Sequence, residues 1–392
     1  MEKIKVLTRP ALFIFIAGIV GLVAWDGNVA PLCTLPVLIL LWRWTGSRRI
    51  AFLTVLTYYL VAGRGLYHGA GVFFGDATSL PGWIYGLGVW VVPSTLLAAV
   101  WGAVWGSRWR GWRLVAILVL ISVPPLGIIG WANPITSAGA LFPGWGWFGV
   151  LTTLALLVVF GVTQRPFLAA LPFLVFAIVA NGSYAPATID GWMAIDTTLG
   201  SARDSSDEYD RLHSLLQLVQ EQSDANPNAK VFVLPELVGG DWSMNSIWWR
   251  STSDQLRAKG QTLLIGALQP YDQNRRYVNA LFSIGQDAGQ TMPDRVPVPL
   301  SMWKPWAVGG ATAFWFNSGV ATIQGHRVAT LICYEQLLVW PVMVSLTKHP
   351  TILVGAANDW WARSTSISRI QREAVRAWGR AFSIPIVWAK NE

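Results

Sequence analysis

Charge is scarce in this sequence of 392 residues. Only 13% of its residues are charged, 53% are hydrophobic, and the mean hydropathy is +0.43. Soluble globular domains ordinarily contain about 25% charged residues. The composition therefore excludes an ordinary soluble globular protein and predicts a membrane protein.

Histidine and cysteine are scarce as well. The four histidines lie far apart, at His68, His213, His326 and His349. None has a second histidine or a cysteine at the spacing of a metal site, and the phosphate-binding pattern GxxxxGK[ST] is absent. We therefore expect neither a metal nor another cofactor. The two cysteines fall in different halves of the chain, so we expect no disulfide, a buried structural role for Cys33 in a membrane helix, and a chemical role for Cys333.

The excess of positive charge belongs entirely to the first half. Residues 1–180 contain 11 Lys and Arg against 3 Asp and Glu, whereas residues 181–392 contain 18 of each. A net charge of +8 on a soluble domain would suggest nucleic-acid binding. Here the basic residues flank apolar segments, so no nucleic-acid partner is predicted.

Seven apolar runs predict about seven membrane helices, near 11–25, 30–42, 50–62, 83–105, 114–132, 143–162 and 166–180. Several are shorter than the ~20 residues of a perpendicular crossing. Basic residues cluster before the first run and after the second, fourth and sixth: Lys3, Lys5, Arg9, Arg43, Arg48, Arg49, Arg108, Arg110, Arg113 and Arg165. Only Arg64 lies on the other side. The positive-inside rule then predicts a multi-pass protein of the bacterial inner membrane, with a cytoplasmic amino terminus and a periplasmic carboxyl-terminal domain.

The second half alternates between strand and helix patterns. Residues 181–191 read as a linker between a membrane domain, 1–180, and a domain at 192–392. Strands are expected near 192–196, 230–235, 262–268, 277–284, 318–324, 327–332, 351–358 and 384–389, and helices near 206–222, 336–346 and 367–382. This alternation predicts a layered α/β domain.

Reactive residues stand at the ends of several of these strands. Glu236 in VFVLPEL lies at an expected strand terminus, Cys333 ends the apolar strand of LICYEQL, and Asn358 and Asp359 lie in GAANDWW. A cysteine attacks as its thiolate, and a carboxylate in a dry pocket can accept the proton. Attack on an acyl carbonyl also creates an oxyanion, which needs a cation or N–H donors, and the backbone N–H of Tyr334 is available for that purpose.

These motifs, in the order Glu, Lys, Cys, resemble the carbon–nitrogen hydrolase (nitrilase) superfamily over residues 190–391. The preceding membrane region extends the resemblance to apolipoprotein N-acyltransferases and especially to the shorter TraB-type conjugal transfer proteins. The resemblance implies an αββα sandwich with Glu236 as general base and Cys333 as nucleophile. It implies supporting or substrate-binding roles for Tyr334, Glu335, Asn358, Asp359 and Trp360, with Glu335 ordering the nucleophile turn.

The family lysine is harder to assign. Alignment of the family segment VPFGE on VPLSM puts Asp294 at the lysine position and Met302 where the family carries a further glutamate. Lys304, in SMWKPW, is the expected oxyanion stabiliser, with Arg295 as its substitute. The chain also ends at Glu392, where the acyltransferases continue into further strands and a last membrane helix, so we expect those parts to be absent.

Two functions follow from the resemblance. One is a membrane acyltransferase or amidase that works through a thioester on Cys333, moving an acyl group from a phospholipid to an amine such as a lipoprotein amino terminus. The other is a catalytically degraded envelope component that contacts the proteins of a conjugation apparatus. A transporter is disfavoured because no charged residue lies in the middle of a predicted span.

Overall fold

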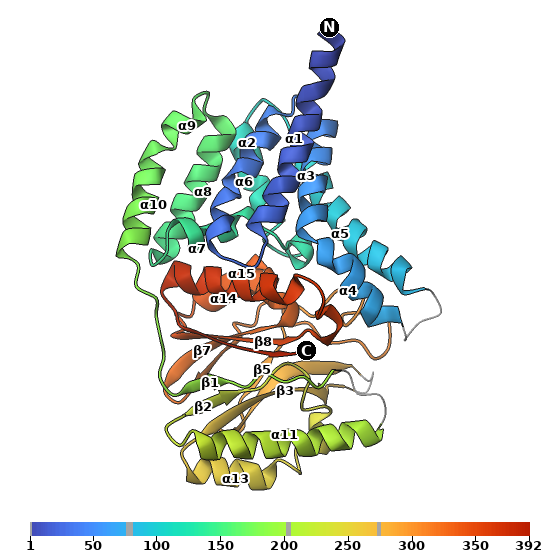
Figure 1. Ribbon diagram of the computed structural model, residues 1–392, viewed down its shortest axis with the longest axis vertical. Coiled ribbons are helices and arrows are strands. Elements are labelled where there is room, and N and C mark those ends of the chain that lie inside the picture. Colours follow the sequence, from blue (N-terminus) through green and yellow to red (C-terminus); the bar gives the residue numbers. More distant parts are fainter. Residues whose placement is uncertain (1, 76–80, 201–204, 273–275) are drawn as a thin grey trace. The chain divides into compact units, whose positions relative to one another are not determined.

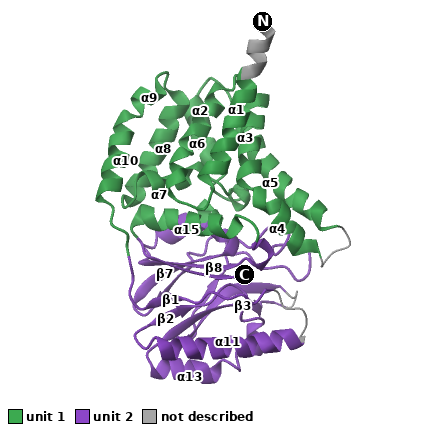
Figure 2. Ribbon diagram, in the orientation of Figure 1, with its two compact units in different colours: residues 1–187, 337–340, 364–383 green, residues 188–336, 341–363, 384–392 purple. Residues whose placement is uncertain are grey.

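The computed structural model describes residues 2–75, 81–200, 205–272 and 276–392. The chain forms two compact units (Figure 2). The helical unit contains residues 1–187, 337–340 and 364–383, and the two-sheet unit contains residues 188–336, 341–363 and 384–392. Residues 364–383 thus group with the helical unit, although the sequence assigned them to the second domain.

The helical unit is built from short and long apolar helices. Its helices are α1 (Glu2–Ala24), α2 (Pro36–Trp44), α3 (Arg48–Ala62), α4 (Arg64–Gly75), α5 (Gly82–Val104), α6 (Arg110–Leu120), α7 (Ala138–Leu141), α8 (Gly146–Val162), α9 (Pro166–Ala169), α10 (Leu171–Ser183) and α15 (Ile367–Phe382). Some ends carry recognisable caps. The Ser47 hydroxyl, for example, accepts a hydrogen bond from the Ile50 N–H at the start of α3.

Among the described residues, α5 is the one continuous helix that is long and apolar enough to cross a membrane. Helices α3 and α4 meet the same criterion only as a pair, and they are bent by 56° at the break between them. Several other apolar helices are shorter. The structure therefore supports one or two candidate spans, and the expected seven are not established.

Two details of the sequence prediction are wrong in this unit. Helix α6 ends at Leu120, so residues 114–132 do not form one helix. The segment continues into short 3-10 turns, which a run of apolar residues does not distinguish from helix. Cys33 lies in the 3-10 helix Ala30–Thr34 with its side chain exposed, and it is not the buried structural cysteine that the sequence suggested. Both cysteines are free thiols.

Helix α15 packs closely within the helical unit. A Cβ on Gly139 would overlap the backbone of Ala377, so only glycine permits this approach of α7 to α15. The Gly144 N–H donates to the Arg380 carbonyl at 2.8 Å. The Gly27 N–H donates to the buried Glu373 carboxyl at 2.9 Å. Helix α15, which the sequence predicted as a connection between two strands of the second domain, therefore also belongs to the helical unit.

The two-sheet unit contains a five-stranded and a four-stranded sheet (Figure 1). The first has the order β1-β2-β3-β4-β5, from β1 (Trp192–Ala194), β2 (Val231–Val233), β3 (Thr262–Pro270), β4 (Tyr277–Gly285) and β5 (Thr291–Pro293). The second has the order β6-β7-β8-β9, from β6 (Val320–Ile323), β7 (His326–Ile332), β8 (Ile352–Asn358) and β9 (Ile386–Asn391). All expected strands are present, and β5 is an additional one.

The strand directions fit the sequence pattern. Strands β1, β2 and β3 are parallel, β3 and β4 form an antiparallel pair, and β7, β8 and β9 are parallel. Strands β2 and β8 are buried on both faces, which explains why their sequences are continuous apolar runs. The turn between β6 and β7 places Gln324 and Gly325 at positive φ.

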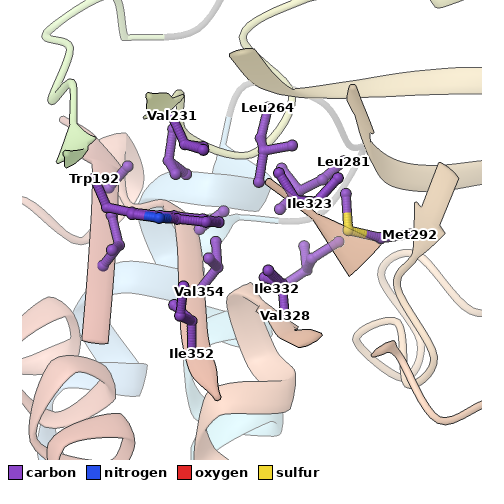
Figure 3. Close-up of a cluster of buried hydrophobic side chains, with 14 of the residues drawn as sticks. Trp192, Val231, Leu264, Leu281, Met292, Ile323, Val328, Ile332, Ile352 and Val354 are labelled. Carbon is purple, nitrogen blue, oxygen red and sulfur yellow. The ribbon is translucent and has the colours of Figure 1, made fainter. Parts of the chain in front are cut away.

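The two sheets pack face to face around a single apolar core (Figure 3). Val231, Leu264 and Leu281 point from the first sheet toward Ile332 and Val354 of the second. Cys333 belongs to this core and is 7% exposed. The nucleophile candidate therefore lies where the two sheets meet.

A second apolar cluster joins the outer face of the first sheet to helices. Helix α11 (Ser205–Ala225) and helix α13 (Arg250–Ala258) contribute to it, and α12 (Trp242–Asn245) lies between them in the chain. Leu215 and Leu256 pack there with Phe232 of β2. Helix α14 (Val339–Leu346) follows the Cys333 turn. The unit is thus an α/β sandwich of two sheets with a helical layer on the first.

Candidate active site

Cys333 directly follows β7 and begins the short 3-10 helix Cys333–Leu337. Its backbone φ is +46°, a left-handed conformation that is unfavourable for a residue with a side chain. Strained backbone of this kind gathers at functional sites, where the surrounding structure holds it. The sharp turn allows the chain to leave the strand while the thiol stays at the strand end.

Glu236 lies just after β2, and its carboxyl accepts a hydrogen bond from the Cys333 thiol. Its other partners are the Asn279 amide, with Nδ2 2.7 Å from Oε1, and the backbone N–H of Asn358. Burial raises the Glu236 pKa to about 7, although the hydrogen bonds from Cys333 and Asn279 oppose this rise. A carboxyl that titrates near neutral pH is suited to accept a proton and return it.

The thiol itself resists ionisation. Burial raises the pKa of Cys333 well above its usual range, and the negative charges of Glu236 and Asp359 raise it further. Both effects favour the neutral thiol over the thiolate. The Glu236 carboxyl, which is hydrogen-bonded to that thiol, is positioned to accept its proton.

Glu335 and Arg295 form a buried ion pair beneath the nucleophile turn. Arg295 Nε lies 2.8 Å from Glu335 Oε1, and both side chains are at most 1% exposed. The Ile332 N–H donates to Glu335 Oε2 at 3.1 Å, which ties the carboxylate to the turn. Arg295 directs its remaining donors to Ser318, Thr330, Pro341 and Ser345. Its guanidinium is thus engaged in supporting the fold at this turn.

Lys304 was expected to supply the oxyanion cation. The residue is half-buried in the segment between β5 and β6, and its backbone passes close to Gly310. Among the described residues, no hydrogen bond or ion pair joins its ammonium to Glu236. Its role as the oxyanion cation stays a prediction.

The remaining expected residues lie close by. Asp359 is fully buried, and its charge acts on both Glu236 and Cys333. Asn358 ends β8, and its side-chain oxygen accepts a hydrogen bond from Asn391 at 2.8 Å. Trp360 is half-buried at the start of the next turn, and Tyr334 directly follows the nucleophile.

Asn279 and Asp294 are site residues to which the sequence pattern gave no role. Asn279 Nδ2 lies 3.3 Å from Asp294 Oδ2 as well as 2.7 Å from Glu236. Burial raises the Asp294 pKa well above its usual range, and the charges of Glu335 and Glu236 raise it further. The available signals were a single amide in the apolar strand YVNALFSIG and the alignment of Asp294 with the family lysine.

Gln336 is a third site residue that the sequence pattern did not indicate. Its side-chain N–H groups donate to the carbonyls of Leu331 and Ala356, both at 3.1 Å, and its Oε1 accepts from the Trp388 indole at 2.9 Å. These bonds join β7, β8 and β9 behind the nucleophile turn. Within the described residues, no group of three or more His, Cys, Asp or Glu side chains is arranged to hold a metal ion.

Comparison with known proteins gives the family. No protein-family model matches the chain. The carbon–nitrogen hydrolase from Helicobacter pylori G27 is similar with a TM-score of 0.40 and 10% identity, covering 51% of this chain and 72% of that chain. Nit3 of Saccharomyces cerevisiae, a member of branch 10 of the nitrilase superfamily, is similar with a TM-score of 0.32 and 14% identity, covering 42% and 62%.

Two relatives are similar along nearly the whole length. The conjugal transfer protein TraB of Agrobacterium fabrum is 34% identical, over 98% of this chain and 93% of that protein. The probable conjugal transfer protein TraB of Sinorhizobium fredii is also 34% identical, over 98% of both. This chain therefore belongs to the family of TraB conjugal transfer proteins.

Proposed function

We propose that this TraB-family protein is a membrane-bound cysteine acyltransferase or amidase. The observation that carries the proposal is the hydrogen bond between the Cys333 thiol and the buried Glu236 carboxyl. The positive φ of Cys333 supports it, because strained nucleophile turns are typical of working active sites. The sequence resemblance to N-acyltransferases supplies the acyl donor, a membrane phospholipid, and an amine as the acceptor.

The proposed reaction has two steps. In the first, Cys333 sulfur attacks the acyl carbonyl while Glu236 takes the thiol proton; the carbon–oxygen bond to the lipid then breaks, and Glu236 returns the proton to the departing alkoxide. A thioester results. In the second, an amine attacks the thioester, the carbon–sulfur bond breaks, and the proton lost by nitrogen restores the thiol. The Tyr334 N–H is the proposed donor to the oxyanion in both steps.

A membrane location is part of the proposal. Helices of the helical unit expose large apolar side chains, including Phe15, Val92, Leu151 and Ile178, each more than half exposed. Apolar surface of this extent requires lipid or a protein partner. The basic loops favour a multi-pass inner-membrane protein with the amino terminus in the cytoplasm and the two-sheet unit in the periplasm. Thiol labelling of cysteines introduced into the loops of intact and permeabilised cells tests this orientation.

Covalent capture tests the chemistry. The purified full chain carrying Cys33→Ser retains one thiol, so intact-protein mass spectrometry after incubation with a labelled phospholipid reports acylation of Cys333 alone. We expect an acyl adduct that hydroxylamine removes. Additional replacement of Cys333 by Ser, or of Glu236 by Gln, should abolish it. A protein that stays unmodified while its thiol reacts with small alkylating agents would contradict the proposal.

A second function is favoured by one observation, the carboxyl of Asp294 at the position of the family lysine. In this alternative the site has lost catalysis, and the protein serves as an envelope component that binds other proteins of the conjugation apparatus. Cys333→Ser would then leave plasmid transfer between cells unchanged. The same substitution should reduce transfer if the thioester chemistry is required, so a mating assay separates the two functions.

A further inference from the structure

Asn391, the last residue of β9, is fully buried, and every polar atom of its side chain is hydrogen-bonded. Its Nδ2 donates to Asn358 Oδ1 at 2.8 Å and to the Gly200 carbonyl at 3.1 Å. Its Oδ1 accepts from the Thr197 hydroxyl at 2.8 Å and from the Leu199 N–H at 2.9 Å. The amide group therefore uses both of its donors and both lone pairs of its oxygen.

The four bonds specify asparagine at position 391. Aspartate has the same size, but its carboxylate has no N–H donors and would face two oxygen atoms, those of Asn358 and Gly200. Alanine would remove all four bonds. Asparagine is itself unfavourable in strands, so strand propensity does not account for its presence in β9. The side chain of Asn391 is thus explained by what it joins.

Asn391 joins the end of β8 to the segment that follows β1. It pairs with Asn358 in the register of β8 and β9, and its carbonyl accepts from the Asp359 N–H at 2.7 Å. Thr197 lies 194 residues earlier in the chain. Backbone bonds hold the same place, since the Glu392 N–H donates to the Thr197 carbonyl at 2.9 Å. These backbone bonds do not require the amide side chain, so we expect β9 to remain paired without it.

The end of β8 is also where the chain reaches Glu236. The Glu236 carboxyl accepts hydrogen bonds from the Cys333 thiol, the Asn279 amide and the backbone N–H of Asn358. The four side-chain bonds of Asn391 in the described structure go to other residues, and one of them fixes the Asn358 side chain. An effect of this amide on Glu236 therefore passes through Asn358.

We propose that Asn391 is a positioning residue, whose side chain holds the backbone N–H of Asn358 against the Glu236 carboxyl. The inference rests on the proposed function, since Glu236 is the base of that reaction. An N–H donor stabilises a carboxylate more than a carboxylic acid. Glu236 must be ionised in order to accept the thiol proton. Asn391 thus helps to keep the base in its working form.

Loss of the Asn391 amide should change how Glu236 titrates. Burial raises the Glu236 pKa to about 7, and the Asn358 N–H is one of the hydrogen bonds that oppose this rise. A weaker bond from this N–H should let the pKa rise further. Substitution at Asn391 leaves in the chain the other titratable groups that bear on Glu236, which are Cys333, Asp294, Asp359 and Tyr277.

Alkylation of Cys333 reads the Glu236 pKa without any acyl transfer. The full chain carrying Cys33→Ser is treated with iodoacetamide at a series of pH values on both sides of the Glu236 pKa of about 7. The reactive state, a thiolate beside a protonated carboxyl, contains as many protons as a thiol beside a carboxylate. The rate should therefore rise with pH and level off once Glu236 is ionised. Glu236→Gln should abolish this bend.

Asn391→Ala should move the bend upward by about half a pH unit or more, as expected when a hydrogen bond to a charged group is weakened. Asn226→Ala is the matched control, because it removes an amide that is bonded to Gln222 at the end of α11. It should leave the bend in place even if it lowers stability. An unmoved bend in Asn391→Ala, or an equal movement in Asn226→Ala, would overturn the inference.

A second variant tests the route through Asn358. Asn358→Ala keeps the backbone N–H and removes the oxygen that accepts from Asn391. It should move the bend in the same direction, and it decides the question should Asn391→Ala fail to fold. The double variant should move the bend no further than Asn391→Ala alone, because both changes act on one N–H. Additive shifts, or an unmoved bend in Asn358→Ala, would refute the positioning role.

Acyl capture separates this inference from the proposed function. Capture of a phospholipid acyl group by the parent, together with an unmoved bend in Asn391→Ala, would retain the function and remove the positioning role. A moved bend without capture by the parent would retain the positioning role and remove the function. If both hold, the rate of acyl capture in Asn391→Ala should require a higher pH, by the same interval that separates the two alkylation bends.

Discussion

The Arg295 guanidinium lies against the Glu335 carboxylate, with Nε 2.8 Å from Oε1, in surroundings that leave both side chains at most 1% exposed. Removal of one partner leaves the other charge buried and uncompensated. We expect Arg295→Met to lower the free energy of unfolding by about 3–5 kcal/mol, measured by urea denaturation followed by tryptophan fluorescence. Arg257→Met breaks an exposed ion pair with Asp254 and should cost about 1 kcal/mol or less.

The double variant Arg295→Met with Glu335→Gln tests whether the uncompensated charge of Glu335 causes this loss of stability. The substitution Glu335→Gln retains a side-chain acceptor for the Ile332 N–H and removes the negative charge. The double variant should therefore be more stable than Arg295→Met alone. If it is equally unstable, Arg295 acts through packing and its bonds to Ser345 and backbone carbonyls, and the charge of Glu335 is not the cause.

Glu236→Gln should separate the reactivity of the thiol from acyl transfer. The negative charge of Glu236 contributes to the raised pKa of Cys333, after burial itself. Without that charge the thiolate is more accessible, so iodoacetamide should alkylate Cys333 faster at pH 8 in a Cys33→Ser background. Capture of a phospholipid acyl group should nevertheless be lost, because no base accepts the thiol proton during attack. If both rates fall together, the variant has distorted the site.

The raised pKa of Glu236 should make the stability of the folded protein depend on pH. Its pKa is raised from 4.5 to about 7 in the folded protein. Between these values the folded protein binds more protons than the unfolded chain, so stability is greatest below about pH 4.5 and falls as pH rises to about 7. This group alone contributes a loss of about 3 kcal/mol over that window. Glu236→Gln should remove the contribution, and the exposed substitution Glu221→Gln should leave the slope unchanged.

The sequence predicted which polar and reactive residues lie at strand ends, because each of these signals is local. Apolar runs define β2, β7 and β8, and a polar residue after such a run must lie at the strand end. The family resemblance was sufficient to predict that Glu236 lies beside Cys333. The place of Lys304 relative to this pair depends on the path of a long connection between β5 and β6, which residue spacing does not determine.

Long-range contacts account for the other differences. Asn279 reads as a polar residue in an apolar strand, and only the approach of β4 to the end of β2 gives it Glu236 as a partner. The grouping of α15 with the helical unit depends on the close approach of Gly139 to Ala377. In the helical half, hydropathy predicted apolar segments but not where helices such as α6 end, because an apolar turn and an apolar helix have the same composition.

Gly266 should be required for the position of Glu236, the proposed catalytic base. This residue lies in β3, and a Cβ there would overlap the carbonyl oxygen of Pro235 and lie 2.5 Å from the Glu236 Cα. Gly266→Ala must therefore displace the backbone that carries Glu236. We expect the free energy of unfolding to fall by about 1–3 kcal/mol, as for other overpacked interiors, and acyl capture on Cys333 to be lost.

The matched control for Gly266→Ala is Gly182→Ala, because a Cβ at Gly182 has no atom within 4 Å. That substitution should leave both stability and capture close to the parent. The rate of Cys333 alkylation adds a readout that simple destabilisation does not predict: displacement of the Glu236 charge should speed alkylation at pH 8, as in Glu236→Gln. An unchanged alkylation rate together with full acyl capture in Gly266→Ala would mean that Glu236 keeps its place despite the added methyl group, and the packing argument for this glycine would fail.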